Sequence, residues 1–214
     1  MSSHPALTDV EETWPVTSST DLHRDSWVVA LRADQVRRPG TEGPDFRRLV
    51  LEHPGAVIVL ALDDQERVCC LAQYRHPAGR RFVELPAGLC DAPGEEPLEV
   101  AQRELREEVG LAAASWTHLT SAYSSPGLSS ELLHYFLARD LTAVERGGVD
   151  LVHEEADMTV FWAPFAELYD AAVGGRVTDA PLVLAVLLAQ ARGQARGQAR
   201  GQARGQARAT SRGE

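Results

Sequence analysis

The sequence predicts a fold of the α/β or α+β class, in which helices pack on a mixed β-sheet. Three observations support this prediction. A near-continuous apolar run fills residues 56–62, a helix with one apolar stripe spans 97–109, and strands and helices alternate after it. Since no linker interrupts this part of the chain, we expect one domain over residues 1–190.

The first half of the chain has the pattern of strands. Residues 26–36 and 47–52 are β-rich, and antiparallel strands within about 11–53 are a candidate subregion of their own. The apolar run at 56–62 indicates a buried strand, and Asp63-Asp64 supply a turn before a second strand at 68–74. We expect these last two strands to form a hairpin.

The second half alternates helices and strands. The best helix spans 97–109. Further strands are expected at 116–123, 132–138 and 159–162. A helix at 164–173 ends before Gly174-Gly175, and Thr178 or Asp179 caps a last helix with Pro181 in its first turn.

Charge divides the chain into an acidic body and a basic tail. The net charge is −10, and all 21 basic residues are arginine. Residues 1–190 carry −15 and residues 191–214 carry +5, so the body is a poor binder of nucleic acid. The tail repeats Gly-Gln-Ala-Arg and has no large apolar side chain, which predicts disorder. A cationic arm that contacts acidic partners is the alternative.

Apolar runs and cysteines bound the class of protein further. The longest apolar run, Ala180 to Ala189, is about half of what crosses a bilayer, and residues 1–15 hold no apolar signal segment. We therefore expect a cytoplasmic protein with no membrane partner. Three cysteines form no disulfide framework, and Cys69 and Cys70 are expected on opposite faces of a strand.

Acidic residues gather on one face of the helix at 97–109. At 100° per residue, Glu104, Glu107 and Glu108 share a face. The neighbouring core face is expected to hold the apolar residues Leu98, Ala101, Leu105 and Val109. Like charges at this spacing repel, and a hard divalent cation relieves the repulsion. The alternative is a solvated acidic face, which Arg103 and Arg106 neutralise in part.

The residues around this helix resemble the Nudix box. The box pattern is Gly, five residues, Glu, seven residues, then Arg-Glu-aliphatic-x-Glu-Glu-x-Gly-aliphatic. Glu95 to Leu111 match it throughout, and the one departure is that six residues, not five, separate Gly88 from Glu95. The resemblance implies a fold in which helices sandwich a mixed sheet, and hydrolysis of a nucleoside diphosphate linked to another group.

The resemblance also assigns roles to the box residues. Glu104, Glu107 and Glu108 would bind Mg²⁺, with Mn²⁺ as a substitute. Arg103 would be mainly structural and orient a helix glutamate, and Glu95 would be a box residue with a supporting role. Gly88 and Gly110 would be backbone positions. Gly88 would belong to the loop, and Gly110 would end the helix, where glycine tolerates a left-handed conformation.

Two further segments resemble the ADP-ribose pyrophosphatase branch of this family. They are Gln73-Tyr74-Arg75-His76-Pro77 with Glu84-Leu85-Pro86-Ala87-Gly88, and Ser125-Pro126-Gly127 with Glu131 beyond it. In this branch the backbone carbonyl at Ala87 binds metal, and a glutamate on a late loop activates water. Glu155 is the first candidate for that base and Glu154 the second. Candidate substrate-binding residues are Arg75, Arg80, Arg81, Glu131 and Trp27, and Trp14 is a weaker stacking candidate.

The branch implies a homodimer, because its N-terminal strands exchange between subunits. The implied activity is Mg²⁺-dependent hydrolysis of ADP-ribose to AMP and ribose 5-phosphate. Two alternatives stay open, namely a Nudix hydrolase for another nucleoside diphosphate sugar and a non-catalytic regulator that binds ADP-ribose.

Overall fold

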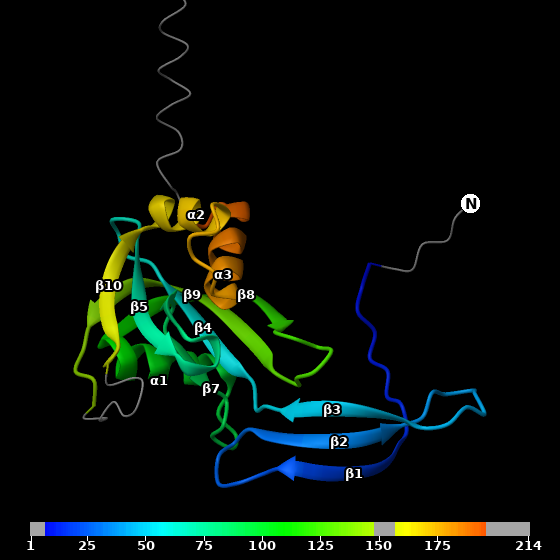
Figure 1. The fold of residues 1–214 in the computed structure, drawn as a ribbon. Coiled ribbons are helices and arrows are strands. Elements are labelled where there is room, and N and C mark those ends of the chain that lie inside the picture. Colours follow the sequence, from blue (N-terminus) through cyan, green and yellow to red (C-terminus); the bar gives the residue numbers. More distant parts are fainter. Residues whose placement is uncertain (1–6, 148–156, 196–214) are drawn as a thin grey trace, which may run out of the picture. The chain divides into compact units, whose positions relative to one another are not determined.

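The structure, a computed structural model, describes residues 7–147 and 157–195. The chain forms two compact units, one of residues 1–53 with 125–130 and one of residues 54–124 with 131–214 (Figure 1). The division at residue 53 separates the N-terminal strands from the remainder. In the part of the chain that is described, no helix combines the length and apolar character needed to cross a membrane.

The first unit is a three-stranded antiparallel sheet in the order β1-β2-β3. Its strands are β1 (Val16–His23), β2 (Ala30–Val36) and β3 (Phe46–Glu52). The sequence analysis did not predict β1, which is exposed along its whole length and lacks the alternation that marks a half-buried strand. The segment 125–130 joins this unit where the Leu51 N–H donates to the Leu128 carbonyl at 2.8 Å.

The second unit holds two sheets and three helices. One sheet has the order β7-β4-β9-β8, and the other has the order β10-β5-β6. The first comprises β7 (Ala87–Leu89), β4 (Ala56–Ala61), β9 (Leu132–Ala143) and β8 (Leu111–Tyr123). The second comprises β10 (Thr159–Pro164), β5 (Arg67–Arg75) and β6 (Arg80–Glu84), and a 3₁₀ turn, η1 (His76–Ala78), precedes β6. The helices are α1 (Pro97–Val109), α2 (Phe165–Val173) and α3 (Ala180–Ala191).

Helices cover both faces of this unit, so the predicted mixed sheet between helices is confirmed (Figure 1). Alternate residues of β4 supply two separate cores. Ile58 and Leu60 pack with α2 and α3, whereas Val57 and Val59 pack with α1. Cys69 and Cys70 divide between the two cores in the same way, as the sequence predicts.

The predicted hairpin of residues 56–62 and 68–74 is wrong. β4 pairs with β7 and, in parallel, with β9, whereas β5 pairs with β6 and β10. Only an isolated bridge, Leu62 to Val68, joins the two segments. The Asp63-Asp64 turn is present, but the two strands that it connects separate into different sheets.

The helix α1 occupies the predicted residues, with one correction to its core face. The Glu96 N–H donates to Glu99 Oε2 at 3.0 Å at its start, and Gly110 ends it with φ of 66°. The buried residues are Val100, Ala101 and Leu105. Leu98 was expected in the core and is 37% exposed, because this first-turn residue lies at the edge of the buried stripe.

The helix α3 begins at Asp179, one of the two predicted caps, whose carboxylate accepts a hydrogen bond from the Leu182 N–H at 2.8 Å. Burial, with Glu84 nearby, raises the pKa of Asp179 from 3.8 to about 6. The stability from this group is complete below pH 3.8 and is lost as the pH rises through about 6, because the fold disfavours the charged form.

Asp179→Asn should therefore stabilise the protein above pH 6. Asparagine keeps the capping oxygen and removes the buried charge, so the free energy of unfolding should rise by on the order of 1–2 kcal/mol at pH 8 and change little at pH 4. Urea denaturation at both pH values measures this, with Asp170→Asn on the exposed side of α2 as the control. An equal effect of Asp179→Asn at both pH values would contradict the assignment.

Candidate active site

The acidic face of α1 forms the centre of the site. The side chains of Glu104 and Glu107 are 14% and 27% exposed. Glu108 is also partly buried. Partial burial strengthens the repulsion between such carboxylates, because less water screens them. This face therefore needs compensating positive charge or hydrogen-bond donors.

The short strand β7 approaches this face closely. A Cβ atom added to Gly88 would lie 2.1 Å from Cδ of Glu104, so only glycine leaves room for that carboxylate. The next contact is at Ala87, whose N–H donates to Oε2 of Glu108 at 3.0 Å. The sequence analysis assigned Gly88 to the loop path, whereas the structure shows that its role is to admit a side chain.

Arg103 supplies positive charge to three glutamates. Its guanidinium contacts Glu104 at 2.6 Å, Glu107 at 3.2 Å and Glu95 at 3.2 Å. Burial alone would lower the pKa of Arg103, but the bonds to Glu95 and the charge of Glu104 outweigh burial and raise it. Arg103 thus stays charged and fixes the positions of these carboxylates.

The donor set around β7 and α1 fits a hard divalent cation. Carboxylate oxygens of Glu104, Glu107 and Glu108 and the Ala87 carbonyl are the oxygen ligands that Mg²⁺ and Mn²⁺ prefer. As the side chains lie, the described residues contain no group of three or more His, Cys, Asp or Glu that could hold a metal ion. The Arg103 guanidinium contacts carboxylate oxygens of Glu104 and Glu107, which belong to this donor set.

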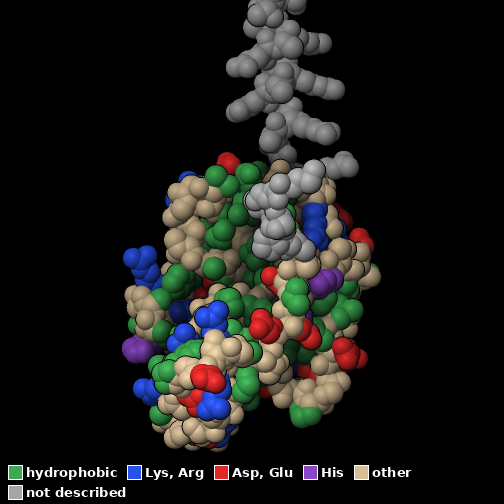
Figure 2. Space-filling view, turned by 90° about the vertical axis from the view of Figure 1, so that its right-hand side faces the viewer, with side chains coloured by type: hydrophobic (Ala, Val, Ile, Leu, Met, Phe, Trp, Pro, Cys, Tyr) green, Lys and Arg blue, Asp and Glu red, His purple; other side chains and the backbone are tan. Residues whose placement is uncertain are grey.

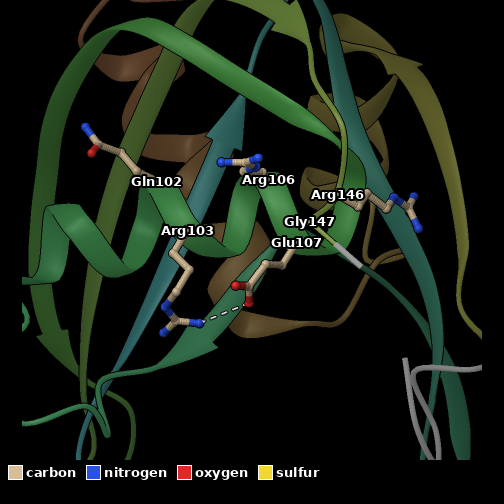
Figure 3. A pocket seen from close by; sticks show the side chains of 6 residues that line it. All are labelled: Gln102, Arg103, Arg106, Glu107, Arg146 and Gly147. Atoms are coloured by element: carbon tan, nitrogen blue, oxygen red, sulfur yellow. Dashed lines mark hydrogen bonds and ion pairs between the residues drawn. The ribbon is translucent and has the colours of Figure 1, made fainter. Parts of the chain in front are cut away.

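A cavity of about 420 Å³ opens on the outer side of α1 (Figure 3). Its lining residues are Gln102, Arg103, Arg106, Glu107, Arg146 and Gly147. Arg103 and Glu107 turn toward one another, whereas Arg106 and Arg146 point in other directions. The cavity therefore reaches the acidic face only through Glu107.

The candidate arginines on β5 and β6 have protein partners. The Arg75 guanidinium donates two hydrogen bonds to the buried carboxylate of Glu84, from Nη2 to Oε2 at 2.7 Å and from Nε to Oε1 at 3.0 Å. Arg81 pairs with Asp157, and Arg80 is exposed beside Arg75. The sequence predicts no role for Glu84. The pairing of β5 with β6 places Glu84 on the strand next to Arg75, and the hydrogen bonds between them indicate that Glu84 orients Arg75.

The other candidates are distributed over both units. Glu131 is partly buried in the second unit. Burial raises the pKa of Tyr135 to about 12, and the charge of Glu131 adds to this rise. Trp27 belongs to the first unit and is 65% exposed. Trp14 packs its ring edge against Phe46. The two candidate bases, Glu154 and Glu155, lie outside the described residues, as does most of the repeat tail.

Charge on the described surface is mixed. On the face in Figure 2, acidic and basic side chains lie interspersed among apolar ones. On this face, such a mixture does not favour a polyanion across a broad area.

Comparisons relate this chain to known proteins. The NUDIX domain family matches residues 52–185. The chain is 44% identical over 181 residues to the ADP-ribose pyrophosphatase of Mycobacterium tuberculosis (strain ATCC 25618 / H37Rv), covering 85% of each chain. It is 42% identical over 118 residues to the ADP-ribose pyrophosphatase of Bacillus subtilis (strain 168), covering 55% of this chain and 62% of the relative.

A solved structure shares the fold. It is described as a crystal structure of an ADP compounds hydrolase and superposes with a TM-score of 0.70. The alignment covers 87% of this chain and 98% of that chain at 21% sequence identity. This likeness concerns the fold, in which the same layers of strands and helices recur.

Gly88→Ala should damage the site through its new methyl group. The methyl group must displace the Glu104 side chain, so we expect a loss of about 1–3 kcal/mol in the free energy of unfolding and weaker binding of Mn²⁺. Chemical denaturation and electron paramagnetic resonance of free Mn²⁺ measure the two effects. Gly43→Ala is the matched control, since its nearest neighbour is 4.0 Å from the added Cβ. Unchanged stability and Mn²⁺ binding in Gly88→Ala would refute the close approach.

Proposed function

Since the chain belongs to the NUDIX family, we propose that it hydrolyses the pyrophosphate bond of ADP-ribose. The observation that carries the substrate assignment is the 44% identity to an ADP-ribose pyrophosphatase over 85% of both chains. The complete acidic face of α1 supports retained catalysis, because a regulator without activity would not need it. Water adds to one phosphorus, the bond to the bridging oxygen breaks, and AMP and ribose 5-phosphate result.

Glu104, Glu107, Glu108 and the Ala87 carbonyl are the groups that we expect to hold Mg²⁺. When bound, the ion neutralises phosphate charge and lowers the pKa of a water molecule. The contribution of the chain itself is to preorganise the ligands. Gly88 admits Glu104, the Ala87 N–H fixes Glu108, and Arg103 holds the flanking carboxylates.

The diphosphate carries negative charge that arginine forks match. Arg75 is the first candidate for this contact, because Glu84 holds its fork in one orientation. Arg80 and Arg81 are further candidates at the β5-β6 end of the second unit. Glu155, or else Glu154, is proposed as the base that takes the proton of the attacking water, and Glu131 and Trp27 as contacts to the remainder of the substrate.

We also propose a cytoplasmic homodimer with no nucleic-acid partner. The first unit supports the dimer, because several large apolar side chains of its strands and of the connection between β1 and β2 are exposed. They are Val16, Leu22, Trp27, Val28 and Leu49. A three-stranded sheet rarely leaves so much apolar surface in water without a partner.

Product analysis tests the proposed activity. The purified chain is incubated with ADP-ribose and Mg²⁺ in H₂¹⁸O, with GDP-mannose, ADP-glucose and NADH in parallel and EDTA as a control. We expect AMP and ribose 5-phosphate from ADP-ribose, no product with EDTA, and ¹⁸O in whichever product holds the attacked phosphorus. Faster turnover of another substrate would overturn the specificity, and binding of ADP-ribose without turnover would overturn the activity.

Glu108→Gln should lower turnover at least about 100-fold while the fold survives. Glutamine keeps the shape and can still accept the Ala87 N–H, but it removes one negative charge from the metal ligands. Steady-state kinetics and the melting temperature separate the two effects. Glu167→Gln, on α2, is the control. Near-normal turnover in Glu108→Gln would remove Glu108 from the metal site.

Light scattering after gel filtration tests the dimer. At micromolar concentration we expect a mass of twice 23.3 kDa. Leu49→Glu, which places a charge on the exposed apolar sheet, should shift the mass toward the monomer. A monomer for the unaltered chain would contradict the proposal.

A further inference from the structure

A second group of metal-ligand side chains lies on β8 and β9. Nε2 of His118 is 3.0 Å from Oγ of Ser121, and Nδ1 of His134 is 2.9 Å from the same oxygen. Two imidazole nitrogens therefore point at one hydroxyl group. None of these three residues belongs to the acidic face of α1, and the proposed hydrolysis uses none of them.

A β-bulge creates this arrangement. In a regular strand, residues three positions apart point to opposite faces of the sheet. The register of β8 against β9 shifts between His118 and Thr120, so His118 and Ser121 come to one face while Leu119 is buried on the other. Ser121 lies directly opposite His134.

Neighbouring groups fix the two rings. The His118 ring packs edge-on against Phe136, with centroids 5.4 Å apart. The His134 ring is partly buried on β9, where the Ser121 hydroxyl contacts its Nδ1. His118 and Ser121 are exposed, so an ion can reach the group from solvent.

We propose that His118 Nε2 and His134 Nδ1 bind a borderline divalent cation, of which Zn²⁺ is the representative. Imidazole nitrogen suits such ions, whereas Mg²⁺ prefers the oxygens of α1. The Ser121 hydroxyl can donate to only one of these nitrogens and must accept from the other. The ion replaces both hydrogen bonds, the ring N–H that donates to Ser121 gives up its proton, and water completes the coordination. With two protein nitrogens and an open side, the site exchanges its ion and binds more weakly than a closed structural zinc site.

This second site is separate from the acidic face, although both lie on the side of the sheet that α1 covers. Gly88, Val57, His134 and Ser121 form one row across β7, β4, β9 and β8. Gly88 and His134 are two strands apart, about 10 Å. The two groups of donors are therefore on different strands, and we propose that each binds an ion of its own.

Histidine side-chain ¹H–¹⁵N nuclear magnetic resonance tests the proposal on the full chain. Zn²⁺ is titrated in excess Mg²⁺, which saturates the carboxylates. We expect the His118 Nε2 and His134 Nδ1 signals to shift together with one affinity. His118→Gln and His134→Gln should each weaken that binding at least about tenfold, and His76→Gln, in an exposed histidine of the same unit, should not.

A second variant covers the case in which a histidine variant unfolds. Ser121→Ala removes the bridging hydroxyl but keeps both nitrogens, so Zn²⁺ binding should persist. Unshifted His118 and His134 signals at millimolar Zn²⁺ would overturn the proposal, as would a Ser121→Ala variant that no longer binds. Neither measurement needs turnover, so the result is independent of the proposed hydrolase activity.

Discussion

Repulsion between carboxylates on one helix face is the constraint on which the candidate active site depends. Glu104, Glu107 and Glu108 lie within two turns of α1, and partial burial deprives them of water. The chain offsets this repulsion from two sides. Arg103 contacts Glu104 and Glu107, and the Ala87 N–H donates to Glu108. These contacts hold the oxygens near β7 before any cation arrives.

The arrangement of the carboxylates also depends on elements around α1. β7 can approach α1 only because Gly88 has no side chain, and β7 is held in position by its antiparallel pairing with β4. The other neighbour of β4 is β9, and the two strands are parallel. This central pairing therefore holds β4 in place, and β4 holds β7 beside the acidic face. The core of Val57, Val59 and Leu105 fixes the helix on that sheet. A substitution in this core would therefore shift the positions of the carboxylates, although the substituted residue does not contact them.

The same face of the sheet presents two kinds of ligand chemistry. Near β7 the proposed ligands are oxygens, and on β8 and β9 they are imidazole nitrogens. A regular strand would not place His118 beside Ser121, so the second group depends on one irregularity in the register of β8. A single extra residue in β8 thus brings His118 and Ser121 to one face, although their spacing in the sequence does not indicate it.

Local features of the chain were sufficient to predict α1, its acidic face and the cap at Asp179. Periodicity, a proline at the start and glycine at position 110 act within a few residues of one another, so they can be read without knowledge of the fold. The helical spacing of Glu104, Glu107 and Glu108 likewise predicted that they share a face. The pairing of β4 and the strands β1, β6 and β7 were not predicted, because partners distant in sequence decide them.

The sequence by itself therefore determined which residues are the candidates for the chemistry, namely the carboxylates of α1 and the arginines near β5. Only the tertiary structure decided why Gly88 must be glycine, that Glu84 holds Arg75, and that His118 and His134 meet at one hydroxyl. The physical reason is the range of the forces involved. Helix geometry and capping are set by hydrogen bonds between near neighbours, whereas strand pairing, register shifts and close packing depend on which distant segments come together.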